Sequence, residues 1–249
     1  MRLLSLILQI LHYTSRTVAV CQDTLERCSG KICIHSDYDR LILPLRNLTN
    51  NVEIGIYDLK ILKIDDNKGI IKTSFWFIIR WNEPRLIAPS NISEEFIKLE
   101  KSFYELLWLP DIMILDLQNM NFRHFLNKDM EVLYLPDNIL QLQTNMLLKS
   151  YCVMHFENYP MDNHICPIYF RSYVHNISAV NLSMAALDTR KGIKLNDYSF
   201  DFKSVHRLHF GNHSEPGIDI KLQRNIFKYV INYYIPSGLL VSISWVKFV

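Results

Sequence analysis

The chain has 249 residues, of which 49% are hydrophobic and 21% charged, so it can bury a sizeable core and is not a disordered chain. Its 27 Lys and Arg residues nearly balance 25 Asp and Glu residues without a basic stripe, so we expect no nucleic acid partner. Only 7 residues are Gly, and the common nucleotide-binding and metalloprotease motifs are absent. We therefore predict a folded protein that is not an enzyme and carries no cofactor.

Residues 1–19 are typical of a secretory signal peptide. Arg2 precedes a short apolar run from Leu3 to Leu11, and small residues allow cleavage after Ala19. A buried core helix is the alternative for this segment. Five glycosylation sequons support export, since a glycan is tolerated only on a protein surface. They begin at Asn47, Asn91, Asn176, Asn181 and Asn212.

Residues 20–229 are predicted to form one all-β domain. Val52 to Ile64 alternates apolar and polar residues, a turn follows, and Ile70 to Trp81 is β-branched and aromatic, which indicates a hairpin. Ser93 to Tyr104 is expected to be a short helix or a loop. Further strands are predicted at Glu131–Leu135, Asn138–Val153, Ile165–Tyr173, Phe200–Phe210 and Ile218–Tyr229. Short strands separated by turns favour an immunoglobulin-like β-sandwich, and we add a short N-terminal helix region.

Residues 230–249 end the chain in an apolar segment. From Tyr233 onward, 17 residues would span about 25 Å as a helix, against about 30 Å of bilayer hydrocarbon. Lys247 falls near the end of this run. We interpret the segment as the first part of a transmembrane helix, with a buried C-terminal helix as the alternative.

The five cysteines are unevenly distributed. Cys152 and Cys166 are separated by thirteen residues, and a bridge between them would stabilise the fold by about 3 kcal/mol in an oxidising compartment. Cys21, Cys28 and Cys33 lie near the start. Because the total is odd, one cysteine is free, or pairs with another chain, or the pairing is unsettled.

Thirteen residues between two cysteines, with Tyr159-Pro160-Met161-Asp162 inside the loop, resemble the signature of the Cys-loop receptors, the pentameric neurotransmitter-gated ion channels. Four further segments resemble this family in the same order. They are Arg80 to Leu86, Trp108 to Asp111, Lys221 to Asn225 and Tyr234 to Ser237. The resemblance covers about Val52 to Val249. It implies the extracellular ligand-binding domain of a chloride-type subunit (GABA-, glycine- or glutamate-gated), truncated in its first transmembrane helix. It also implies a homo- or hetero-pentamer at the plasma membrane, with a synaptic location.

The resemblance assigns a coupling role to the loop. It implies that the bond from Tyr159 to Pro160 is cis, which gives the loop a tight tip. It also implies an ion pair between Asp162 and Arg224 beneath the sandwich, where ligand binding is relayed to a pore. Two ordinary solvated charges are the alternative.

The resemblance further implies a small neurotransmitter bound between adjacent subunits. On the complementary face it assigns Trp76, Ile78 and Gln143. On the principal face it assigns Met113, Tyr173 and the tip from Gly211 to Gly217, with His213 and the flanking Phe210. Aromatic walls suit an ammonium group, while core packing is the alternative for the aromatic residues and His213.

Some residues depart from the family pattern. Ile78 stands where amino-acid-binding relatives often have a carboxylate-binding Arg, which argues against glycine, glutamate and GABA at a homomeric site. No cysteine follows Cys166, so the adjacent-Cys pair of acetylcholine-binding subunits is missing. His206, His209 and His213 would point to opposite faces of extended strands, so we predict no metal site.

Two other functions stay open. The runner-up is a pore-less ligand-binding or subunit-sequestering protein, either secreted or held by its apolar tail. The third is a catalytic or adhesive sandwich.

Overall fold

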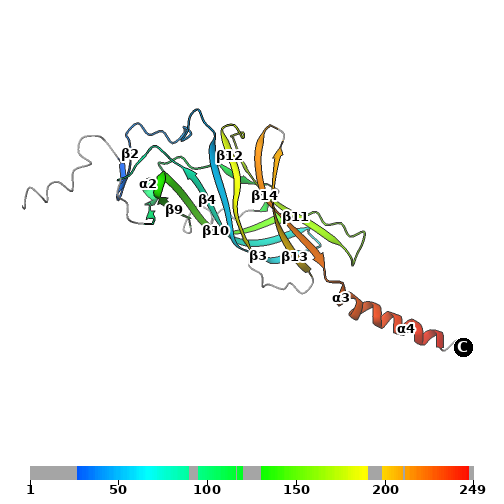
Figure 1. Ribbon diagram of the computed structural model, residues 1–249. Coiled ribbons are helices and arrows are strands. Elements are labelled where there is room, and N and C mark those ends of the chain that lie inside the picture. Colours follow the sequence, from blue (N-terminus) through cyan, green and yellow to red (C-terminus); the bar gives the residue numbers. More distant parts are fainter. Residues whose placement is uncertain are drawn as a thin grey trace, which may run out of the picture.

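The computed structural model describes residues 27–89, 95–115, 117–119, 130–189, 198–209 and 211–246. Most of this part of the chain is strand, as predicted, and the strands pack as a β-sandwich (Figure 1). The predicted signal peptide, Cys21, Asn91 and Phe210 lie outside the described residues.

The larger sheet of the described chain has seven strands. Their order is β12 (Val180–Thr189), β3 (Asn50–Asp65), β4 (Ile70–Asn82), β10 (Ile139–Tyr151), β9 (Met130–Leu135) and β6 (Ile97–Lys98), with β8 (Leu117–Asn119) also paired to β10. The long β3–β4 hairpin is the predicted one. In β4 every second residue from Ile71 to Trp81 is buried, because alternate side chains of a strand point to opposite faces.

A second sheet has four strands, in the order β13 (Tyr198–His209), β14 (His213–Arg224), β11 (Asn163–Ser172) and β7 (Ile112–Ile114). The two inner faces share one apolar core. Phe77 of β4 stacks on Phe170 of β11 with ring centroids 5.1 Å apart, which joins the sheets directly.

The N-terminal part of the described chain forms a small third sheet of β1 (Arg27–Ser29), β2 (Ile32–Ile34) and β5 (Leu86–Ile87). A disulfide joins Cys28 and Cys33 across its hairpin, which resolves a pairing that the sequence left open. No helix occurs in residues 27–89, so the predicted N-terminal helix region is not found in this part. The segment predicted as a short helix or loop holds one helical turn, α2 (Lys101–Tyr104).

The end of β14 differs from the prediction. The strand leaves the sheet at Arg224 and does not reach Tyr229. Asn225 accepts a hydrogen bond from the Phe227 backbone N–H and so caps a helix, which stops the strand. The helix runs through α3 (Ile226–Tyr229), the π-helical turn η2 (Val230–Tyr234) and α4 (Ile235–Val246). The 3-10 turn η1 (Pro136–Asn138) joins β9 to β10.

The C-terminal helix projects away from both sheets, at the opposite end of the sandwich from β2 and α2 (Figure 1). Residues Ile226–Val246 are long and apolar enough to cross a membrane, and none of this span is buried against the domain. The alternative of a buried C-terminal helix is therefore wrong for these residues.

Candidate ligand-binding and coupling sites

The three residues expected on the complementary face lie together on the outer face of the seven-stranded sheet. Trp76 and Ile78 are two residues apart on β4, so their side chains point to the same side of the sheet, and Ile78 lies opposite Gln143 of β10. The Trp76 side chain is 44% exposed, so core packing is the wrong interpretation of this residue. On the other side of β4, Tyr57 of β3 lies opposite Trp76, and it is an aromatic neighbour that sequence reasoning missed. Aromatic and aliphatic side chains thus gather on one outward surface.

A row of hydrogen-bonded polar side chains crosses the same face. Arg80 Nε donates to Gln141 Oε1 at 2.7 Å, and Gln141 Nε2 donates to Gln143 Oε1 at 3.3 Å. Gln143 Nε2 in turn donates to Glu131 Oε2 at 3.1 Å, and Lys98 Nζ donates to Glu131 Oε1. The hydrogen bonds from Lys98 and Gln143 lower the pKa of Glu131. The row therefore fixes the orientation of Gln143.

The residues expected on the principal face surround the end of β11. Tyr173 follows this strand and is 74% exposed, so it is not a core residue either. Asp111 holds the segment around it. Its carboxylate accepts from Ser172 Oγ at 2.6 Å and from the Val174 N–H at 2.8 Å, while its carbonyl accepts from the Tyr173 N–H at 2.9 Å. Asp111 thus positions Tyr173, which the Trp-x-Pro-Asp motif did not indicate.

The β13–β14 hairpin packs its tip on the same segment. His213 Nδ1 donates to the His175 carbonyl at 2.9 Å, and the Asn212 carbonyl accepts from the Ile177 N–H at 2.7 Å. The tip is shorter than predicted, because β14 begins at His213. Gly217 is a strand residue, where an added Cβ would lie 2.3 Å from Cδ1 of Tyr169. Met113 of β7 pairs with Arg171 of β11, next to this region.

A buried carboxylate anchors the hairpin to β11. The ladder between β11 and β14 ends at Tyr169 and Gly217. Beyond this point Glu215, which is fully buried, accepts from Arg171 Nη1 at 3.3 Å and from Arg207 Nε at 2.7 Å. Arg207 also lies over the Tyr169 ring, with Cζ 3.6 Å from the ring centroid. Side chains therefore continue the connection where backbone pairing stops.

The expected coupling residues meet at the end of the sandwich next to the C-terminal helix. The Cys152–Cys166 disulfide closes the loop, and the Tyr159–Pro160 bond is cis, as expected. Asp162 and Arg224 are both buried. Arg224 Nε donates to Asp162 Oδ1 at 2.7 Å and Nη2 donates to Oδ2 at 2.9 Å, a two-pronged ion pair. The alternative of two solvated charges is wrong.

Other groups complete this ion cluster. Asp66, in the β3–β4 turn, accepts from Arg224 Nη1 at 3.1 Å and from the Tyr198 hydroxyl at 2.8 Å. Burial alone would raise the pKa of Asp162, but hydrogen bonds from Arg224 and His164 outweigh it and lower the pKa. Burial and the bond to Asp66 raise the pKa of Tyr198. At the loop tip, the hydrogen bond with Tyr229 and burial raise the pKa of Tyr159 to about 12.

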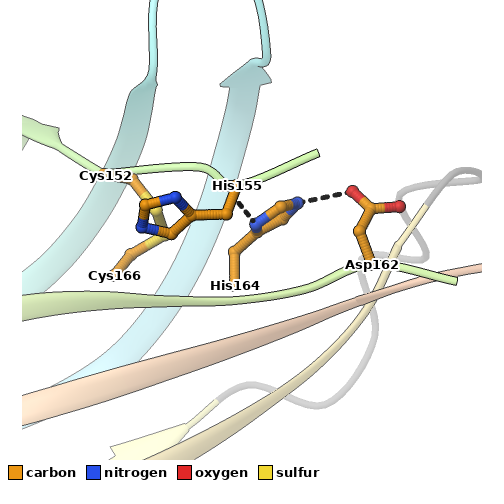
Figure 2. Close-up of a disulfide and its surroundings, with 5 residues drawn as sticks. All are labelled: Cys152, His155, Asp162, His164 and Cys166. Carbon is orange, nitrogen blue, oxygen red and sulfur yellow. Dashed lines mark hydrogen bonds and ion pairs between the residues drawn. A yellow bond between two sulfur atoms is a disulfide. The ribbon is translucent and has the colours of Figure 1, made fainter. Parts of the chain in front are cut away.

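His164 is a further member of the cluster that sequence reasoning missed, together with Asp66 and Tyr198. Its ring is fully buried, and Nε2 lies 2.6 Å from Asp162 Oδ2. The His155 backbone N–H donates to Nδ1 at 3.4 Å. Figure 2 shows His164 between these two partners, with the disulfide beside it.

Residues 31–226 match the family described as the neurotransmitter-gated ion-channel ligand binding domain. The chain belongs to this family. It is 28% identical to the gamma-aminobutyric acid receptor subunit pi of Rattus norvegicus over 68% of this chain and 40% of that protein. It is 24% identical to the pH-sensitive chloride channel 2 of Drosophila melanogaster over 85% of this chain and 45% of that protein. It is 23% identical to the acetylcholine receptor subunit beta-type lev-1 of Caenorhabditis elegans over 92% of this chain and 45% of that protein.

The chain thus spans less than half the length of these curated relatives. The relatives are receptors and channels, not enzymes, which confirms the prediction that this domain is not an enzyme.

One of the family-like segments has a structural role in this ligand-binding domain. Glu83 is fully buried and accepts from Arg85 Nε at 2.6 Å, Arg85 Nη2 at 2.7 Å and the Tyr38 hydroxyl at 2.9 Å. Arg85 Nη1 also donates to the carbonyls of Asp39 and Ile42. The ion pair therefore ties residues 38–42 to the end of β4, far from the coupling cluster.

The described sequons of this ligand-binding domain differ in exposure. Asn47, Asn176 and Asn212 are exposed, whereas Asn181 is half-buried and donates through Nδ2 to Asn51 Oδ1 at 3.3 Å. Asn176 and Asn212 lie close together, since Asn212 accepts from the Ile177 N–H.

Proposed function

We propose that this chain is the extracellular ligand-binding domain of a chloride-type ligand-gated channel subunit at the plasma membrane. It binds a small neurotransmitter between adjacent subunits of a homo- or hetero-pentamer. The observation that carries this proposal is the placement of the candidate residues in two groups. Trp76, Ile78 and Gln143 lie on the seven-stranded sheet, whereas Met113, Tyr173 and His213 belong to the four-stranded sheet and its loops.

Each group exposes an aromatic side chain and is half of a pocket. A single chain presents the two halves on different sheets, so a complete pocket requires the principal half of one subunit to meet the complementary half of the next. Such a head-to-tail contact closes into a ring when the rotation from one subunit to the next is a whole-number fraction of a full turn. A pentamer satisfies this condition, because each of its subunits is rotated by one fifth of a turn.

The chemistry of the halves favours an ammonium ligand. Trp76, Tyr57 and Tyr173 offer aromatic faces, and one desolvated cation–π contact contributes about 2 kcal/mol. Ile78, opposite Gln143, adds an apolar wall and provides no guanidinium that could bind a carboxylate. The proposed transmitter is therefore held mainly through its ammonium end.

The chloride type is supported by two of the relatives, one a gamma-aminobutyric acid receptor subunit and one a pH-sensitive chloride channel. A synaptic location follows from the same class of receptor. Exposed Asn47, Asn176 and Asn212 are proposed to carry glycans, together with Asn91 and the less accessible Asn181.

The proposed relay runs from the pocket to a pore through the loop of Cys152 and Cys166. Its support is the buried pair of Asp162 and Arg224, because Arg224 lies two residues before the helix that begins at Ile226. That helix is proposed to enter the membrane. Tyr159, at the tip of the loop, packs edge-on against Tyr229 of the helix with ring centroids 5.3 Å apart. Movement of the loop would thus be transmitted to the helix through this contact.

Binding to the full chain tests the proposal. The chain is produced through a secretory pathway, purified in detergent and titrated with a panel of ammonium transmitters that includes GABA, glycine and acetylcholine. Trp76→Ala and Tyr173→Ala are each expected to weaken the best ligand about 30-fold, the equivalent of 2 kcal/mol. Tyr151→Ala is the matched control, since Tyr151 is 46% exposed at the far end of β10. Unchanged binding in both pocket variants would refute the proposed site.

A further inference from the structure

Two guanidinium groups share one buried carboxylate on the four-stranded sheet. Glu215 of β14 is fully buried, and its two carboxylate oxygens have different partners. Oε1 accepts from Arg171 Nη1 of β11 at 3.3 Å, whereas Oε2 accepts from Arg207 Nε of β13 at 2.7 Å. A guanidinium has several N–H donors, and Glu215 takes one from each. Both groups therefore keep donors for an anion, and Glu215 neutralises only one of the two positive charges.

The two guanidiniums lie on the side of the sheet that carries the principal half of the pocket. Arg171 is directly opposite Met113 of β7, and the Tyr173 N–H continues this pairing with a 2.9 Å hydrogen bond to the carbonyl that precedes β7. Side chains two residues apart on a strand point to the same side, so Arg171 and Tyr173 share this side. Arg207 lies directly opposite Glu215, which places it there as well.

Packing holds Arg207 in place. Its Cζ lies 3.6 Å from the centroid of the Tyr169 ring. This ring lies close against Gly217, where an added Cβ would be 2.3 Å from Cδ1, and its hydroxyl donates to Asp219 at 3.2 Å. The side chains of Arg207 and Arg171 are nevertheless 44% and 25% exposed. Both guanidiniums are thus positioned in advance but open to a ligand, which lowers the entropic cost of binding.

The chemistry of the pair suits a carboxylate. A planar guanidinium binds a carboxylate through two parallel hydrogen bonds and repels an ammonium group. Arg171 and Arg207 therefore disfavour the ammonium end of a transmitter. On the complementary half, Trp76 and its cross-strand neighbour Tyr57 offer aromatic faces to a cation. A ligand that bridges the two halves is expected to carry an ammonium group at one end and a carboxylate at the other.

We propose that Arg171 and Arg207 form a carboxylate-binding subsite on the principal face, and that the transmitter is a small amino acid. Ile78 leaves the complementary half without a guanidinium, and the subsite supplies one from the opposite half of the pocket. The identity of the ligand rests on the proposed function, because the half that binds the ammonium group belongs to the adjacent subunit.

Matched ligands test the subsite in the wild-type chain. The full chain in detergent is titrated with glycine, β-alanine and GABA, and with the amines that lack only the carboxylate, which are methylamine, ethylamine and propylamine. Loss of a charge-assisted hydrogen bond weakens binding about 10- to 100-fold. In at least one pair the amino acid is expected to bind more tightly than its amine by this factor. Equal affinities in all pairs, or binding of none of the amino acids, would overturn the inference.

Variants assign the preference to the guanidinium pair. Arg207→Gln is expected to weaken binding of the amino acid about tenfold or more while the matched amine binds unchanged. Lys203→Gln is the control, because Lys203 is an exposed cation four residues earlier on the same side of β13, and it should change neither affinity. Arg207→Lys keeps the charge beside Glu215 and should retain part of the preference. An equal loss for amino acid and amine in Arg207→Gln would overturn the inference, since Arg207 would then act on the structure alone.

The inference and the proposed function fail in different ways. Unchanged binding in Trp76→Ala and Tyr173→Ala refutes the pocket between subunits. If these variants lose binding while amino acids and amines bind equally well, the pocket stands and only the carboxylate subsite is refuted. The comparison of ligand pairs needs no variant to fold, so it decides the question even if Arg207→Gln is unstable.

Discussion

Replacement of Arg224 by Met gives the sharpest test of the coupling cluster. Arg224 donates two hydrogen bonds to Asp162, at 2.7 and 2.9 Å, and one to Asp66 at 3.1 Å. Asp162 is 2% exposed, so without Arg224 its charge is buried beside His164 alone. Removal of one partner from a buried ion pair costs about 3 to 5 kcal/mol. Asp66 is one-third exposed and adds little to this cost.

The stability that Arg224→Met loses depends on pH in a defined direction. The pKa of Asp162 is lowered in the folded protein, so its ionised form contributes stability above the unfolded pKa of about 4, and this contribution is lost as the pH falls through the folded value. In Arg224→Met the carboxyl can be buried neutral once it binds a proton. The difference in stability between wild type and variant is therefore largest near pH 7 and narrows below about pH 4.

Urea unfolding followed by tryptophan fluorescence measures the free energy of unfolding of both proteins. Lys221→Met is the control, because Lys221 is exposed three residues earlier on β14, and a change of about 0.5 kcal/mol or less is expected. The double variant Asp162→Asn with Arg224→Met should lose at least about 2 kcal/mol less than the sum of the single losses. A loss below about 1 kcal/mol at pH 7, or a loss independent of pH, would refute the reasoning.

Three further predictions concern the rest of the domain. Glu215→Gln should cost about 1 to 3 kcal/mol of unfolding free energy in the same assay, because a buried charged acceptor is lost; a neutral effect would mean that Glu215 does not anchor the hairpin. Asp111→Ala should cost about 1 to 2 kcal/mol and weaken ligand binding through displacement of Tyr173, measured by titration; unchanged affinity would remove its positioning role. Replacing Cys152 and Cys166 by Ser should lower stability by about 3 kcal/mol in denaturant titrations, and equal midpoints would contradict that contribution.

The strong strand patterns were predictable because their burial is local and periodic. The hairpin of β3 and β4 follows from alternation on both sides of a turn with Gly69 at φ 60°. By contrast, β12 was not predicted, since its sequence from Val180 lacks strict alternation and its pairing with β3 is parallel and distant in the chain. The helix cap at Asn225 ends β14 at Arg224, and the apolar residues that follow led to the prediction of a longer strand.

In the candidate sites, too, some residues could be assigned from the sequence, while their contacts with other elements could not. Trp76, Ile78 and Gln143 were assigned to one face by the resemblance to the family, whereas the register that makes Ile78 and Gln143 neighbours is known only from the pairing of β4 with β10. Their partners came from other elements and could not be read from spacing alone. His164 is buried in the alternating pattern of β11, which begins at Asn163, two residues before the predicted start of this strand, and Asp111 reaches Tyr173 only through the pairing of β7 with β11.

Co-assembly of two defective chains tests most directly whether the ligand site lies between subunits. Trp76→Ala removes the complementary aromatic and Tyr173→Ala removes the principal one, so pentamers of either variant alone should bind the best panel ligand about 30-fold more weakly. When the two chains are co-expressed, interfaces that join Tyr173 of one chain to Trp76 of the other are intact. The account predicts a fraction of sites with wild-type affinity in the mixture. Absence of any high-affinity sites from mixed pentamers, or full affinity in either variant alone, would contradict it.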